Sequence, residues 1–235
     1  VLVGTPSAAG HEWVLFTRPP APRTSDEFYA NAAVGEFWTG RRPDLAHVKA
    51  LLGLATQDVR HFPPAETIGA SPLALIAEAD PLLARELEPT PHHDDAANAL
   101  LAQVISEMRL VKDSYEIEQL TAAIEATHRG FDDIVHSVSE AIGHERGERV
   151  VEGVFGKRAR IEGNATGYDT IAASGPHACI LHWVRNDGPV HAGDLLLVDA
   201  GIEMDSLYTA DITRTLPVSG TFSPDQRMIY EAVLE

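Results

Sequence analysis

The sequence is poor in cysteine, in aromatic side chains and in positive charge. It contains one cysteine, so no internal disulfide can form, and we expect a protein of a reducing compartment, the cytoplasm. Lys and Arg number 18 against 35 Asp and Glu, which gives a formal net charge of −17. Because nucleic acids and anionic membrane surfaces bind basic faces, this charge argues against both as partners.

Long apolar runs are also missing. No stretch approaches the roughly 20 apolar residues that cross a bilayer, so we expect no transmembrane helix. Hydrophobic residues make up 44% of the chain, as in globular proteins. The pattern of elements changes near residue 110 and predicts two domains, residues 1–109 and residues 110–235.

The first domain alternates strand-like and helical stretches. Trp13–Thr17 is a predicted strand that ends at a proline-rich segment, because proline cannot continue a central strand. Helical character follows at Leu45–Leu54, Ser71–Ala79 and Ala96–Met108. This alternation predicts an α/β domain, in which helices flank a sheet.

A histidine pair precedes the last of these helices. His92 and His93, next to Asp94 and Asp95, could suggest a metal site. The segment is a proline-flanked loop that leads into a helix, so capping by one of the aspartates is the better explanation.

The second domain opens on a signal for the start of a helix. Asp113 can cap a helix, and Glu116 three residues later completes a capping box. Apolar residues from Ile117 to Val138 then recur at helical spacing, which predicts a long helix packed on the core. Two further helices are expected at Val150–Glu162 and Pro224–Glu235.

The most informative stretch is Leu195–Pro217, LLLVDAGIEMDSLYTADITRTLP. Asp199 ends one strand-like run, and Asp211 precedes another at Ile212–Leu216. In an antiparallel hairpin centred on Asp205, the two aspartates fall opposite each other, with Cβ atoms about 4.5–5.5 Å apart. Carboxylates this close repel, and a divalent metal or a pair of metals removes the conflict. The alternative is that both are turn formers, but aspartate is depleted in strands.

This hairpin resembles a known family. VDAG followed by YTADITRTLPVSGTFSPDQRMIYEAVLE is similar to the pita-bread metallopeptidases, and within them to the Xaa-Pro aminopeptidases and prolidases. The resemblance implies an α+β pita-bread fold for the second domain. It also implies that Asp199 and Asp211 bind two divalent ions, expected to be Mn²⁺, with Co²⁺ or Zn²⁺ as alternatives. The family's aspartate spacing is more often one residue shorter, so the extra residue is expected in the turn, as a bulge.

A second match lies upstream. Tyr168-Asp169-Thr170-Ile171 and Cys179-Ile180-Leu181-His182-Trp183 resemble the strand–turn–strand that precedes the family's hairpin. The family's histidine lines the pocket and stabilises charge during attack on the peptide bond, which implies a catalytic role for His182. The resemblance likewise implies supporting roles beside the ligands for Tyr168 and Thr213. Taken alone, His182 is explained as a strand histidine with a satisfied hydrogen bond.

Two neighbouring side chains have structural explanations. The apolar neighbours of Cys179 predict a buried thiol rather than a nucleophile. His177 follows a Gly-Pro turn signal and is expected in a loop.

The resemblance implies a metal-dependent aminopeptidase that releases the N-terminal residue from peptides with proline at the second position. Prolidase, a dipeptidase of the same fold, is one alternative, and a non-catalytic pita-bread binding module is another. A creatinase-like amidinohydrolase keeps the fold without the metal site, and the two aspartates argue against it. We also expect a homo-oligomer, either a dimer or a tetramer, and a creatinase-like first domain without metal ligands.

Three further ligands of the family, one histidine and two glutamates, come from strands downstream of the hairpin. No histidine follows His191 in this sequence. We therefore expect the pita-bread domain to be incomplete, the chain to be truncated at both ends, and the chain alone to be inactive.

Overall fold

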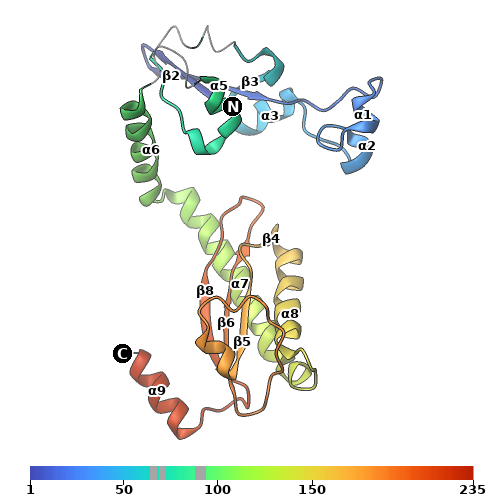
Figure 1. The fold of residues 1–235 in the computed structure, drawn as a ribbon, viewed down its shortest axis with the longest axis vertical. Coiled ribbons are helices and arrows are strands. Elements are labelled where there is room, and N and C mark those ends of the chain that lie inside the picture. The colour runs from blue at the N-terminus through green and yellow to red at the C-terminus, as the bar shows by residue number, and fades with distance from the viewer. Residues whose placement is uncertain (64–67, 69–71, 88–93, 235) are drawn as a thin grey trace. The chain divides into compact units, whose positions relative to one another are not determined.

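The computed structural model describes residues 1–63, 68, 72–87 and 94–234. They form two compact units, Val1–Met108 and Arg109–Glu235 (Figure 1). Among the described helices, none has the length and the apolar character needed to span a bilayer.

The N-terminal unit contains a three-stranded sheet. β1 (Leu2–Ser7) pairs antiparallel with β2 (Gly10–Thr17), and β2 pairs parallel with β3 (Ala55–Asp58). The predicted strand Trp13–Thr17 is confirmed as part of β2. The helices of this unit are α1 (Glu27–Ala30), α2 (Glu36–Thr39), α3 (Leu45–Leu52), α5 (Pro81–Leu87) and α6 (Asp95–Leu110), with 3₁₀ turns η1 (Val59–His61) and η2 (Ala77–Ala79).

The predicted helix Ser71–Ala79 is wrong over its described part. Only the short 3₁₀ turn η2 forms there. The backbone N–H of Leu75 instead donates to Asn98 Oδ1 of α6 over 2.7 Å, a tertiary bond that outweighs a weak local propensity. His92 and His93 lie outside the described residues, and Asp94 Oδ1 accepts from the N–H of Ala96, as helix capping predicts.

The C-terminal unit packs two long helices against one sheet. α7 (Ser114–Ile142) and α8 (Gly147–Glu162) lie side by side on one face of the antiparallel sheet β5–β6–β8 (Figure 1). The predicted capping box of Asp113 and Glu116 is present at the start of α7. The strands are β5 (Ile171–Ser174), β6 (Leu195–Ala200) and β8 (Ile212–Pro217), with a small pair β4 (Ala165–Thr166) and β7 (Ile202–Glu203), a 3₁₀ turn η3 (Gly175–Cys179) and α9 (Pro224–Leu234).

The core lies between these helices and the sheet. Ile134 of α7, Phe155 of α8 and Leu196 and Val198 of β6 are almost wholly buried in one apolar cluster. Burial along β6 alternates with the period of a strand. Asp199 therefore projects from the face of the sheet opposite the helices.

Candidate functional site

Four of the candidate side chains, Tyr168, Asp199, Asp211 and Thr213, gather on the sheet face turned away from α7 and α8. Asp199 pairs with Ile171 on β5 and with Thr213 on β8, so these residues form one row across the sheet. Thr213 Oγ1 donates a hydrogen bond to Asp199 Oδ2 over 2.5 Å. Such a bond fixes the orientation of a carboxylate before it receives a ligand.

The predicted pairing of Asp199 with Asp211 is wrong by two residues. Asp199 opposes Thr213, and the bridge between Glu203 and Thr209 continues the same register. The hairpin is therefore centred on Ser206 and has no bulge between these points. The extra residue is absorbed by the turn, in which Leu207 adopts a φ of +66°. In this register Asp211 is the diagonal neighbour of Asp199 on the same face, at a usual Cβ separation of somewhat under about 7–8 Å.

Tyr168 orients one of the two carboxylates. Its hydroxyl donates to Asp211 Oδ1 over 2.9 Å. Burial of the ring, together with the adjacent carboxylates of Asp199 and Asp211, raises the pKa of Tyr168 well above its usual range. The phenol therefore remains protonated near neutral pH and serves as a hydrogen-bond donor to Asp211.

Gly201 makes this close arrangement possible. A Cβ atom on this residue would lie 1.6 Å from the carbonyl oxygen of Ala210 and 3.2 Å from Cε1 of Tyr168. Any side chain at Gly201 would thus separate the two arms of the hairpin and displace the Tyr168 ring. The packing explains the glycine of the D-A-G sequence without a direct role in chemistry.

His182 is exposed and lies in a turn, not in a strand. The predicted strand Cys179–Trp183 is wrong because Gly175, with a φ of +54°, and the proline after it start η3, and a turn follows. Cys179 is exposed rather than buried. Its neighbours Ile180 and Leu181 are exposed as well, so local hydrophobicity did not indicate burial here.

One buried carboxylate has no signal in the sequence. Glu148, in the first turn of α8, is fully buried. Its oxygens lie 2.7–2.9 Å from four nitrogen atoms, which belong to Ser174, His177, Trp183 and Gly188. His177 is therefore part of a polar network within η3 instead of an unattached loop side chain. No local signal could have shown this, because a glutamate in a first helical turn is ordinary and its partners lie 26 to 40 residues away.

The residues present fit part of a metal site. Asp199 and Asp211 offer hard oxygen donors of like charge, each oriented by a hydroxyl group. Within the part of the chain that the structure describes, no group of three or more His, Cys, Asp or Glu side chains is placed to hold a metal ion. The pair therefore suits a divalent cation that takes its remaining donors from elsewhere.

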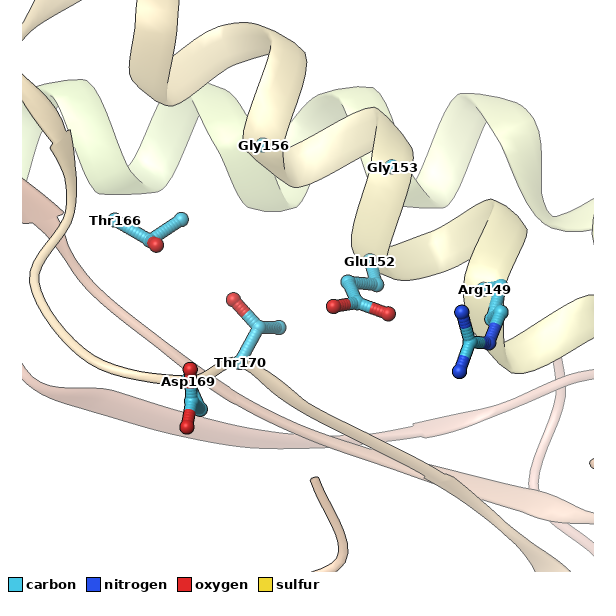
Figure 2. A pocket seen from close by; sticks show the side chains of 7 residues that line it. All are labelled: Arg149, Glu152, Gly153, Gly156, Thr166, Asp169 and Thr170. Carbon is cyan, nitrogen blue, oxygen red and sulfur yellow. The ribbon is translucent and has the colours of Figure 1, made fainter. Parts of the chain in front are cut away.

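An open groove of about 390 Å³ lies between α8 and the Thr166–Thr170 segment (Figure 2). Glu152 extends from α8 toward Thr170 in this view, and Arg149 lies on the far side of Glu152 from Thr170. The groove does not include the two candidate carboxylates. The candidate site is the carboxylate pair, because each of its two members accepts a hydrogen bond from a hydroxyl group that orients it. The full lining is Arg149, Glu152, Gly153, Gly156, Thr166, Asp169 and Thr170.

Comparison with known proteins gives consistent matches. Residues 118–235 match the model of a protein family described as Metallopeptidase family M24. Xaa-Pro aminopeptidase 2 of Streptomyces coelicolor is 46% identical over 230 residues, which cover 96% of this chain and 47% of that protein. Xaa-Pro aminopeptidase 1 of the same organism is 44% identical over 237 residues, which cover 100% of this chain and 47% of that protein. The chain spans about half the length of the curated relatives it matches.

Solved structures agree. Zinc-substituted Escherichia coli aminopeptidase P in complex with product has a TM-score of 0.73 and 27% identity, with coverage of 99% of this chain and 53% of that one. Proline aminopeptidase P II from Yersinia pestis has a TM-score of 0.66 and 26% identity, with coverage of 96% and 52%. These similarities confirm the expected pita-bread fold class.

Proposed function

Because the chain belongs to metallopeptidase family M24, we propose that the protein containing it is a metal-dependent aminopeptidase that releases the N-terminal residue from peptides with proline at the second position. The names of its relatives, Xaa-Pro aminopeptidases, support this substrate class and favour it over prolidase. The observation that carries the proposal is the pair Asp199 and Asp211 on one sheet face, each oriented by a hydroxyl donor.

In this proposal the two aspartates hold two divalent cations, together with donors from outside the described residues. When bound, such ions supply hydroxide near neutral pH and polarise the carbonyl of the scissile bond. Thr213 and Tyr168 hold the carboxylates of Asp199 and Asp211 in their binding orientations. Hard oxygen donors support Mn²⁺ as the native metal, with Zn²⁺ and Co²⁺ as the ions to compare.

His182 acts on the substrate in this proposal. Its exposed imidazole is available to a peptide that approaches the sheet face. A ring N–H would donate a hydrogen bond to the carbonyl oxygen as negative charge develops on it. The bond that breaks is a tertiary amide, and its nitrogen belongs to proline.

Location and assembly belong to the same proposal. The single cysteine supports a cytoplasmic protein, and the net charge of −17 supports peptides rather than nucleic acid or membranes as partners. A homo-oligomer, dimer or tetramer, rests on the family resemblance, and sedimentation of the native polypeptide measures it.

The test is release of alanine from Ala-Pro-Phe by the native polypeptide that contains residues 1–235, after metal removal and readdition of Mn²⁺, Zn²⁺ or Co²⁺. We expect metal-dependent release that Asp211→Asn abolishes and the matched carboxylate change Glu152→Gln leaves intact. Cleavage of the dipeptide Ala-Pro without cleavage of the tripeptide Ala-Pro-Phe would make the protein a prolidase. Peptide binding without any cleavage would make it a binding module.

A further inference from the structure

Glu148 is the most deeply buried carboxylate among the described residues, and the proposed mechanism leaves it without a role. Its side chain has no exposed surface, although it stands in the first turn of α8. An ionised carboxylate is costly to bury unless hydrogen bonds satisfy it. The groups that satisfy it here therefore show what the residue does.

All of these groups belong to one segment, Ser174–Gly188. Oε1 accepts from the backbone N–H of Ser174 over 2.9 Å and lies 2.8 Å from Nδ1 of His177. Oε2 accepts from Nε1 of Trp183 over 2.9 Å and from the backbone N–H of Gly188 over 2.7 Å. One carboxylate thus binds both ends of the segment and two side chains within it.

The segment carries His182 between these attachment points. Trp183, the next residue, is buried against Ile171 and Ala173, on the same sheet face as Asp199. The ring of His177 stacks on Trp183 with centroids 3.9 Å apart. His182 therefore lies in a short turn, and the residue that follows it is held by packing and by a hydrogen bond.

Asn186 attaches the same segment to β5. Its side chain accepts from the N–H of Ala172 and donates to the carbonyl of Thr170, and its φ is +45°. These bonds hold the far end of the segment whatever occupies position 148. A change at Glu148 is therefore expected to release the turn around His182 without detaching the whole segment.

We propose that Glu148 is the positioning residue for His182: its buried carboxylate holds the Ser174–Gly188 segment so that the imidazole is presented at the Asp199 face. This inference rests on the proposed function in so far as His182 serves peptide hydrolysis. Glu148 acts through Trp183 and His177 and does not touch the substrate.

A carboxylate is needed for this role because the partners are donors. Ser174, Trp183 and Gly188 each present an N–H group, and His177 does so in the tautomer with its proton on Nδ1. An isosteric amide would place its NH₂ group against at least one of these N–H groups in either orientation. Glu148→Gln thus disrupts this set of hydrogen bonds while keeping the volume of the side chain.

The kinetic test compares Glu148→Gln, His182→Ala and the double variant in the native polypeptide, with Ala-Pro-Phe as substrate and metal content measured for each. We expect Glu148→Gln to lower kcat by about 10²-fold, the cost of a misplacement near 1 Å, with metal content unchanged. The double variant should be no slower than His182→Ala, because both changes remove the same contribution. Losses that multiply, or an unchanged kcat in Glu148→Gln, would overturn the proposal.

The matched control is Glu152→Gln, four residues further along α8. Glu152 lies on the open groove instead of in the core, so the same chemical change there should leave kcat unchanged. Where Glu148→Gln fails to fold, Trp183→Phe removes one donor and keeps an aromatic ring. It should lower kcat by a smaller factor, and this loss should again vanish in the His182→Ala background.

A second readout separates this inference from the proposed function. If the unchanged protein cleaves no peptide, the proposed function fails, and nuclear magnetic resonance then decides the role of Glu148. Glu148→Gln should speed amide exchange at Ser174 and Gly188, shift the Trp183 indole signal and shift the ring signals of His182. Ring signals of His182 that stay unchanged while the Trp183 signal moves would refute the positioning role.

Discussion

The two faces of the β5–β6–β8 sheet carry different kinds of side chain. Toward α7 and α8, β6 presents Leu196, Val198 and Ala200, all fully buried. Toward the other side it presents Leu197 and Asp199, which are only partly buried. The same three strands thus complete the larger apolar core on one face, and on the other they carry oriented polar groups beside the smaller apolar cluster of Ile171, Ala173 and Trp183.

This difference assigns separate tasks to alternate residues of a strand. Successive side chains point to opposite faces, so a well-packed apolar layer lies directly behind the strand that carries Asp199. Stability should depend on the helix face and chemistry on the Asp199 face. Changes on each face test that separation.

The largest effect is expected for Asp211→Asn on the Asp199 face. Metal affinity should fall by more than about 100-fold, because loss of a ligand exceeds the 10- to 100-fold cost of losing a group that orients one. Turnover should disappear with the metal. Metal content and Ala-Pro-Phe cleavage measure this, and the melting temperature of the metal-free protein should not fall, because the change removes like-charge repulsion. A lower melting temperature would contradict the expectation that the Asp199 face contributes to chemistry and not to stability.

Phe155→Ala on the helix face should act on stability instead. Phe155 is fully buried and packs edge-on against Phe131, so its removal should cost about 3–5 kcal/mol of unfolding free energy. Urea unfolding measures this. Val233→Ala on α9, where the side chain is 82% exposed, is the control and should change the free energy by no more than about 0.5 kcal/mol. Equal losses in the two variants would contradict the assigned core.

Tyr168→Phe should have an intermediate effect confined to the Asp199 face. The ring stays, but the hydroxyl that donates to Asp211 is lost. Metal affinity should fall by about 10- to 100-fold, measured by calorimetric titration. Tyr208→Phe is the matched control, because its hydroxyl donates to Glu116 instead. An equal loss of affinity in Tyr208→Phe would show that the effect is not local.

The smallest effect concerns ion pairs that join α7 to α8. A hydrogen bond from Arg158 lowers the pKa of Asp133, and one from Arg129 lowers the pKa of Glu162. Because the folded-state pKa values are depressed, this stabilisation is present above the unfolded values near 4 and is lost as pH falls through the folded ones. Arg158→Ala should therefore flatten the decline of stability below about pH 4. Urea midpoints at a series of pH values measure the slope, and an unchanged slope would exclude these pairs as contributors.

Much of the fold followed from short-range patterns, whereas the details of the site did not. The capping box at Asp113 and the strand-like apolar run before Asp199 are local signals, and both elements form as predicted. The register of the hairpin depends on how the Met204–Tyr208 turn closes, which the spacing of two aspartates cannot fix. The burial of Glu148 has no local signal because its four partners lie far along the chain, and the apolar neighbours of Cys179 do not show that it lies in an exposed 3₁₀ turn.

Glu116 joins contacts of very different range. One oxygen of its carboxylate accepts from the N–H of Asp113, three residues away, and the other accepts from the hydroxyl of Tyr208, 92 residues away. Closing a chain segment of that length is slow compared with forming one helical turn. We therefore expect the cap of α7 to form early in folding. The second carboxylate oxygen of Glu116 then remains available to accept the hydrogen bond from Tyr208 at the hairpin tip. The hairpin that carries the two aspartates would then dock last, when Tyr208 binds the Glu116 side chain that already caps α7.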